Sequence, residues 1–329
     1  MSMKLDSLKV AALTAMAASS FATASADENL WVYARGVDTR PQGSWELKLQ
    51  DIIKTGKEGG DYTSHEIRAG AEYGVTDKLT VGAEVILFHH DYSVTNPDLQ
   101  PYFDTQGGAG GSISEANFGG YEFEFKYNIL SPYAREDGIG LSLGAGWEHR
   151  ESYRLDGADI DQDTIVLYGY LQKNFLDDTL VFALTPKVEL EKRTSGLGAD
   201  FVLEEEIALD ISAGVSYRFA PKWYAGLEYR HQSDYLVPLV IGEDGGLVYD
   251  EPELRPSDID LFFPELGEQF QNGNYIGPTL HYGEEKWWVT AGALFQFDGG
   301  GRDGSFNVGN KNYDEHEDLH FSLAVGFNF

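Results

Sequence analysis

The chain has 329 residues, no cysteine and a formal net charge of −30. The lack of cysteine excludes disulfide frameworks, thiol catalysis and thiolate metal sites. The acidic excess excludes binding to nucleic acid or anionic lipid through a basic surface, because such surfaces need clustered Lys and Arg. It fits a solubilising surface, or loops that bind divalent cations.

The first 26 residues have the features of a secretory signal peptide. Lys4 and Lys9 precede the apolar run VAALTAMAASSFA, and Ala24-Ser25-Ala26 supplies the small residues of a cleavage site. No later segment contains about 20 uninterrupted apolar residues, so the sequence predicts no membrane-spanning helix. Export with cleavage of residues 1–26 is therefore expected.

Residues 27–42, DENLWVYARGVDTRPQ, show no sustained period. From Trp45 onward, apolar and polar residues alternate with a period of two, which is typical of strands with two different faces. The alternation predicts strands near 43–54, 64–75, 78–92, 117–130, 139–153, 163–176, 179–193, 202–219, 223–235, 274–283, 286–299 and 317–329.

The connections between these strands alternate between short and long. The tight turns are Thr76-Asp77, Asp177-Asp178, Ala220-Pro221-Lys222 and Glu284-Glu285, with a moderate turn at 131–138. The longer segments are 55–63, 93–116, 154–162, 194–201, 236–273 and 300–316. This asymmetry predicts an all-β fold: a transmembrane, antiparallel, up-and-down β-barrel of about twelve strands, with short periplasmic turns and long extracellular loops.

The last segment, EDLHFSLAVGFNF, alternates up to the terminal Phe329. It resembles the closing strand of bacterial outer-membrane β-barrels. We expect it to pair with the first strand near Trp45, which removes the last open edge and places Phe329 at the inner rim. Residues 43–329 then form the barrel, and residues 27–42 form a periplasmic lead-in against its mouth. Whether that lead-in plugs the lumen stays open.

One strand face collects charged residues, which would each cost several kcal/mol against lipid, so we expect them to face inward. One interpretation is an interior filled with ion pairs, and the other is a narrow hydrated channel. The predicted lumen-lining residues are Glu46, Lys48, Arg68, Glu72, Glu84, Glu122, Glu124, Lys126, Glu148, Arg150, Lys187, Glu189, Glu191, Arg193, Asp210, Arg218, Glu228 and Arg230.

His231 and Ser233 lie two apart on a predicted strand and share the outward face. This H-x-S pair resembles that of outer-membrane phospholipases and lipid A deacylases. The resemblance implies a lipid-facing serine nucleophile with histidine as its general base. In those families a further residue orients the histidine from the next strand. Here the long loop 236–273 separates the two strands, which leaves Asn274 or Glu243 as candidates for that role.

The sequence predicts no cofactor and no dedicated metal site, with one weak calcium candidate. Asp156, Asp159, Asp161 and Asp163 form a dense acidic loop, but they lack the spacing of an EF-hand. These carboxylates are candidates for weak calcium binding or for bridging to lipopolysaccharide through divalent ions. Loop 236–273 is long enough to be functional, and its Leu261-Phe262-Phe263 triplet is a candidate lid.

The Trp31 to Trp45 opening and the hairpin EYGVTDKLTVG resemble a family of uncharacterised Gram-negative outer-membrane barrels, grouped with putative transporters. The leading interpretation is a passive channel for small hydrophilic solutes or cations. It is located in the outer membrane among lipids and lipopolysaccharide, and its oligomeric state is open. The alternatives are a lipid-facing esterase that uses His231 and Ser233, and a structural or surface-binding barrel without transport.

Overall fold

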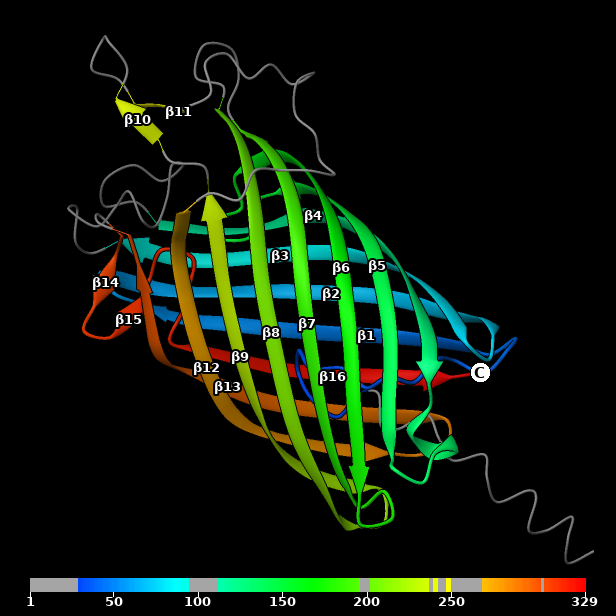
Figure 1. Cartoon of the computed structure of the whole chain (residues 1–329). Coiled ribbons are helices and arrows are strands. Elements are labelled where there is room, and N and C mark those ends of the chain that lie inside the picture. The colour runs from blue at the N-terminus through cyan, green and yellow to red at the C-terminus, as the bar shows by residue number, and fades with distance from the viewer. Residues whose placement is uncertain are drawn as a thin grey trace, which may run out of the picture.

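The computed structural model describes residues 29–94, 112–195, 202–236, 239–241, 247–249, 268–302 and 305–329. Within these ranges, twelve long strands close into one antiparallel barrel (Figure 1). The strands are β1 (Trp45–Lys57), β2 (Gly60–Thr76), β3 (Leu79–Val94), β4 (Ser112–Leu130), β5 (Ile139–Ser152), β6 (Asp159–Phe175), β7 (Leu180–Ser195), β8 (Val202–Ala220), β9 (Trp223–Leu236), β12 (Glu268–Gly283), β13 (Trp287–Gly301) and β16 (Leu319–Asn328).

The long strands follow one another around the barrel in chain order, so the predicted up-and-down fold is confirmed. Two short ribbons, β10 (Leu239–Ile241) with β11 (Leu247–Tyr249) and β14 (Asn307–Val308) with β15 (Lys311–Asn312), are additional. A single 3₁₀ turn, η3 (Pro132–Ala134), is found in the described residues between β4 and β5. Those residues contain no helix that is long and apolar enough to cross a membrane.

Two predicted loops are wrong. Residues 55–63 are mostly strand, because β1 and β2 continue until Lys57 pairs with Gly60, which leaves Glu58 and Gly59 as a tight turn. Gly59 has a φ of +91°, a conformation that glycine adopts without steric cost. The predicted loop 154–162 is likewise partly strand, since β6 already begins at Asp159. Polar side chains suggested loops in both places, but strand pairing depends on the backbone.

The predicted closure of the barrel is confirmed. Leu47 of β1 lies opposite Phe327 of β16 in an antiparallel pair. Beyond that register, Trp45 N donates to Phe329 O at 3.1 Å, and Phe329 N donates to Trp45 O at 2.9 Å. The last residue of the chain therefore completes the hydrogen bonding of the first strand and leaves no open edge there.

The two faces of the barrel wall differ sharply in polarity. In β4, Phe123 is 52% exposed on the outside, whereas its neighbour Glu122 is 4% exposed on the inside. Leu47, Leu143 and Phe295 are also about half exposed on the outside. An outward apolar belt over a closed sheet is the arrangement that hydrocarbon requires, because a closed sheet pairs its backbone groups between neighbouring strands.

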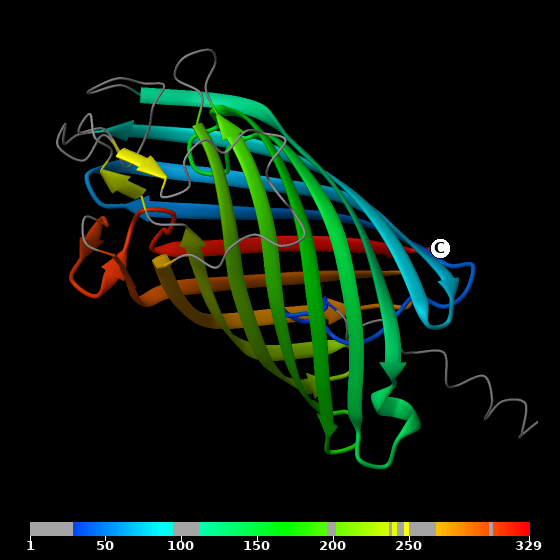
Figure 2. The ribbon, with the colours of Figure 1, turned by 45° about the horizontal axis from the view of Figure 1, so that its top comes forward.

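The barrel interior is occupied by the plug segment, defined as residues 29–40. Figure 2 shows this segment, in blue, running inside the barrel toward the end where the C-terminus lies. Leu30, Trp31 and Ala34 are buried against lumen-facing residues of β7 and β9, namely Val181, Ala183 and Tyr224. This small apolar core anchors the plug segment to one side of the wall.

Candidate functional site

Glu228 of β9 is the main polar anchor of the plug segment. Its carboxylate accepts hydrogen bonds from three consecutive backbone nitrogens: Val32 N to Oε2 at 2.8 Å, and Tyr33 N and Ala34 N to Oε1 at 2.7 Å each. The side chain of Glu228 has no exposed surface. Hydrogen bonds to an ionised acceptor are the strong ones, so this carboxylate fixes a turn of the plug segment in place.

Other lumen side chains hold the rest of the plug backbone. They come from five further strands, so the plug segment is tied around the wall rather than to one point. The contacts are Arg40 N to Thr80 Oγ1 (2.7 Å), Lys126 Nζ to Gly36 O (2.7 Å), Val37 N to Gln172 Oε1 (3.0 Å), Arg35 N to Thr185 Oγ1 (2.9 Å) and Thr290 Oγ1 to Asn29 O (2.5 Å). A segment without regular structure thus satisfies its buried backbone groups, as burial demands.

Two arginines of the plug segment pair with acidic side chains of the wall. Arg40 lies 2.7 Å from Glu46 and 3.3 Å from Glu72, and Arg40 and Glu46 are almost fully buried. Arg35 lies 3.0 Å from Glu124. Removal of one member of a buried pair leaves an uncompensated charge. Displacement of the plug segment would have the same effect, so these contacts stabilise its position.

A cavity of about 120 Å³ lies between the plug segment and the outer end of the barrel. Tyr33 and Arg35 of the plug segment form part of its lining. Arg68 of β2 also lines it and contacts Glu66 at 2.7 Å, Glu122 at 2.7 Å and Glu148 at 3.1 Å. A water molecule needs roughly 10–15 Å³ of such volume, so the cavity has room for several.

The predicted lumen residues fall into two groups in the structure. Glu46, Glu72, Glu124, Lys126 and Glu228 contact the plug segment. Others form ion pairs or line the cavity above it: Lys48 with Glu84, Arg68 with Glu122 and Glu148, Arg150 with Glu148, Lys187 with Glu189, Arg230 with Asp210, and Glu191 and Arg193 in the lining. The arrangement matches an ion-paired interior more closely than an open channel.

Arg218 differs from the other members of that set. Its guanidinium lies 3.5 Å from Asp177 O at a tight turn, away from the cavity. The neutral residues Thr80, Gln172, Thr185 and Thr290, by contrast, bind the plug segment and were not among the predicted lumen residues. The period-two alternation of the sequence already placed these four residues on the inward face. They were missed because only charged residues were selected as lumen-lining.

An outer loop, residues 305–318, narrows the other end of the barrel. Lys57 Nζ donates to Tyr313 O at 2.6 Å and to Asp314 O at 2.9 Å. Phe306 and Tyr313 of this loop form a buried cluster with wall residues of β2 and β3, namely Tyr62, Tyr92 and Val94. The loop therefore packs against the inner side of the wall at the outer end of the barrel, whereas the plug segment itself lines the cavity.

Glu315 carries the main charge contact of that loop. Its carboxylate pairs with Arg154 and accepts a hydrogen bond from Tyr153 at 2.5 Å. Burial alone would raise the pKa of Glu315, but the positive charges of Arg154 and Arg193 and the Tyr153 hydrogen bond bring that pKa down to about 2. His316 beside it is fully buried, and burial holds its pKa well below the ordinary value.

The candidate catalytic pair and Asn274 meet on the outward face. His231 of β9 lies opposite Asn274 of β12 in the sheet register. His231 Nδ1 is 2.9 Å from Asn274 Oδ1, and His231 Nε2 is 3.2 Å from Ser233 Oγ. Glu243, the other candidate third member, and the Leu261-Phe262-Phe263 triplet lie outside the described residues.

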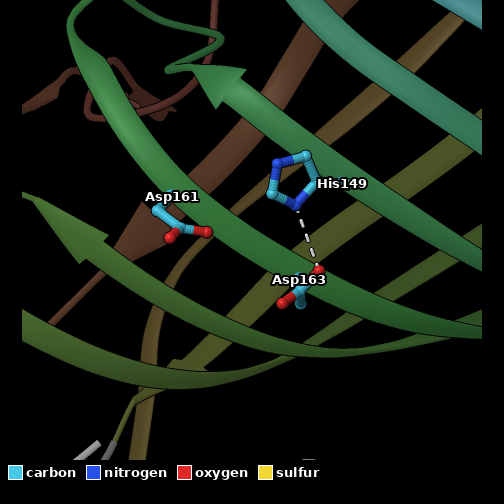
Figure 3. A group of neighbouring side chains, drawn as sticks. All are labelled: His149, Asp161 and Asp163. Atoms are coloured by element: carbon cyan, nitrogen blue, oxygen red, sulfur yellow. Dashed lines mark hydrogen bonds and ion pairs between the residues drawn. The ribbon is translucent and has the colours of Figure 1, made fainter.

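The calcium candidates separate in the structure. Asp156 is buried in a turn, where its Oδ1 accepts a hydrogen bond from Ala158 N at 2.8 Å. Asp161 and Asp163 face outward from β6 and lie near His149 of β5, which was assigned no role from the sequence (Figure 3). The ligand atoms of these three residues lie within 4.8 Å of one another, and Asp163 contacts His149 Nδ1 at 3.1 Å. Weak calcium binding by Asp156, Asp159, Asp161 and Asp163 stays a prediction.

One solved structure shares this fold, and a second resembles it less closely. The crystal structure of the COG4313 outer membrane channel from Pseudomonas putida F1 is similar with a TM-score of 0.55 at 11% identity, covering 91% of this chain and all of that one. The NanC porin is similar with a TM-score of 0.44 at 10% identity, covering 85% of this chain and 98% of that one. No curated protein matches the chain. The family of unknown function DUF6662 matches residues 23–329, so the chain belongs to that family.

Proposed function

We propose that this protein is an outer-membrane channel for small hydrophilic solutes, with an interior narrowed by its own N-terminal segment. The observation that carries the proposal is the charged cavity of about 120 Å³ inside a closed barrel with an apolar outer belt. Such an interior suits water and small polar solutes, whereas an apolar core would exclude them. The outer-membrane channel of similar fold supports this class of function.

The charges of the cavity favour neither ion sign strongly. Among the described residues, the lining contains eight basic side chains (Arg35, Lys54, Arg68, Arg150, Arg154, Lys187, Arg193 and Arg230) and six acidic ones (Glu66, Glu122, Glu148, Glu189, Glu191 and Asp210). The cation preference expected from the sequence would therefore arise in the acidic outer loops, which lie mostly outside the described residues.

The location in the cell is part of the same proposal. The basic and apolar N-terminus with its Ala24-Ser25-Ala26 site would direct export, and residues 1–26 would be removed. The outward apolar belt would then contact outer-membrane lipids, with lipopolysaccharide around the outer end. A structural barrel without transport is the alternative that the functional experiment must exclude.

The test is the conductance of the purified mature barrel in a planar lipid bilayer under a salt gradient. Discrete current steps are expected, and the reversal potential reports the ion preference. A deletion of residues 29–40 serves as the open reference, since it removes the plug segment but no strand. If both the complete barrel and the deletion variant are electrically silent, the channel proposal is wrong and the structural alternative stands.

A further inference from the structure

Three polar side chains on the outward face form a connected chain of hydrogen bonds. Ser233 Oγ lies 3.2 Å from His231 Nε2, and His231 Nδ1 lies 2.9 Å from Asn274 Oδ1. The first two residues share one face of β9, because residues two apart on a strand point the same way, and Asn274 stands opposite His231 on β12. A hydroxyl, a base within hydrogen-bond reach and a third group on the base define a nucleophile triad.

The surrounding contacts select the histidine tautomer that a general base requires. Asn274 Oδ1 also accepts a hydrogen bond from Tyr229 Oη at 2.8 Å, and its Nδ2 donates to Asp298 Oδ2 at 3.4 Å. The carboxylate of Asp298 can only accept hydrogen bonds. The amide nitrogen of Asn274 must therefore face Asp298, and its oxygen must face His231. Neutral His231 then carries its proton on Nδ1, which leaves the Nε2 lone pair directed at Ser233 Oγ.

The position of the triad selects its substrate. His231 lies beside the exposed apolar residue Ile211 of β8, and Asn274 lies near exposed Ile276 on its own strand. Ser233 is three residues from the outer end of β9, and Tyr229 and Tyr235 share its face. Aromatic side chains gather where the apolar belt meets the headgroups, which is also the depth of lipid ester bonds.

We propose that Ser233, His231 and Asn274 form a serine esterase site that cleaves an acyl ester of an outer-membrane lipid. Ser233 Oγ attacks the ester carbonyl carbon while His231 Nε2 takes the hydroxyl proton. The carbonyl–oxygen single bond breaks, the histidine returns that proton to the leaving alcohol, and the acyl group remains on Ser233. Water then adds to the acyl-enzyme, gives one proton to His231 Nε2, and releases a fatty acid as the proton passes back to Ser233.

Access to the nucleophile is a specific requirement of this site. Ser233 has no exposed surface, although His231 is partly exposed beside it. A neighbouring group must therefore move before an ester reaches Ser233 Oγ. A small ester needs less movement than a lipid, so it tests the reactivity of Ser233 first. The site lies on the outer face of the wall, so its activity does not depend on passage of solutes through the lumen.

The experiment uses the complete mature barrel in detergent micelles. It is treated with a fluorophosphonate probe and, separately, with p-nitrophenyl butyrate, phosphatidylethanolamine vesicles and purified lipopolysaccharide. We expect probe labelling on Ser233 and release of butyrate, and the last two substrates distinguish the phospholipid from the lipopolysaccharide source. Ser233→Ala and His231→Gln should each lower hydrolysis about 1,000-fold.

Three variants separate catalysis from structural hydrogen bonding. Ser216→Ala, in the neighbouring strand and on the inward face, should leave hydrolysis unchanged. Asn274→Asp keeps an acceptor for His231 Nδ1 and should retain activity, whereas Asn274→Ala should lose most of it, with both barrels folded by circular dichroism. If the folded parent barrel shows neither labelling nor hydrolysis above Ser233→Ala, or if the two Asn274 variants behave alike, the proposal is overturned.

Discussion

The backbone nitrogen of Tyr33 donates to Glu228 Oε1 over 2.7 Å, although 195 residues separate the two in the sequence. The same carboxylate also holds Val32 and Ala34. Because the plug segment has no regular structure of its own, such contacts with the wall supply the hydrogen bonds that a helix or sheet would otherwise provide. The barrier of the proposed channel is therefore built from residues 29–40 and from inward-facing side chains of the wall, Glu228 of β9 among them.

Glu228→Gln should loosen the plug segment without disturbing the wall. The amide has one acceptor oxygen and one donor group, so it cannot serve the three nitrogens that the carboxylate binds. Hydrogen bonds to charged groups contribute about 1.5–3 kcal/mol each, so local opening at residues 32–34 should become roughly 10- to 100-fold more frequent. Hydrogen exchange measures that opening, and bilayer conductance should rise in parallel.

The matched control for this change is Glu285→Gln, in the tight turn between β12 and β13. It makes the same chemical change on an exposed side chain that takes no part in the contacts of residues 32–34, so exchange at those residues should equal that of the parent. If Glu228→Gln exchanges at residues 32–34 at the same rate as the parent, the carboxylate of Glu228 does not hold the plug segment.

Gly214→Leu should displace the plug segment by steric conflict. A Cβ atom at position 214 would lie 2.3 Å from Trp31 Nε1, far closer than such atoms approach, and the rigid indole cannot yield locally. Proteolysis should then cleave within residues 29–40, and conductance should increase. Gly300→Ala is the control, because the nearest atom to its added carbon is Asn272 Nδ2 at 3.7 Å. A protease-resistant plug segment in Gly214→Leu would contradict the arrangement.

The period-two alternation predicted the strands and the closing β1–β16 pair because one face of each strand must meet lipid and the other the interior. Glu228 was placed in the lumen by the same rule. Its partners were not predictable, since backbone nitrogens carry no side-chain signal. The alternation also could not predict that His231 lies opposite Asn274, because the long loop 236–273 leaves the register between the two strands undetermined.

The terminal residue should stabilise the barrel mainly through its backbone. Phe329 exchanges two hydrogen bonds with Trp45, whereas its side chain is 72% exposed. Deletion of Phe329 should therefore lower the free energy of unfolding by about 1–3 kcal/mol, and Phe329→Ala should lower it by less, because it keeps both hydrogen bonds. Urea unfolding in lipid vesicles measures both values. Equal losses would assign the effect to the aromatic ring instead.

Acidification should release the outer loop, and His316 determines the pH range. Within the described residues, neither ring nitrogen of His316 has a hydrogen-bond partner, and burial keeps the pKa of the docked imidazole well below its ordinary value. The released loop binds a proton near pH 6.5 and the docked loop does not, so docking is strongest above pH 6.5 and weakens as pH falls. Glu315, with a pKa of about 2 when docked, adds a further loss below about pH 4.5.

His316→Leu separates these two ranges. Leucine fills the buried site without a proton-binding group, so docking of residues 305–318 should become independent of pH between about 6.5 and 4.5, while the loss below that range persists through Glu315. The measurement is hydrogen exchange of residues 305–318 as a function of pH, with bilayer conductance alongside. Glu315→Gln is the complementary variant: it should reduce the loss at low pH, with the remainder carried by Glu317 of the same loop, whose pKa is also about 2, and it should keep the dependence near pH 6. If the parent loop exchanges at the same rate at pH 7.5 and pH 5 after correction for intrinsic exchange, the buried imidazole does not control docking.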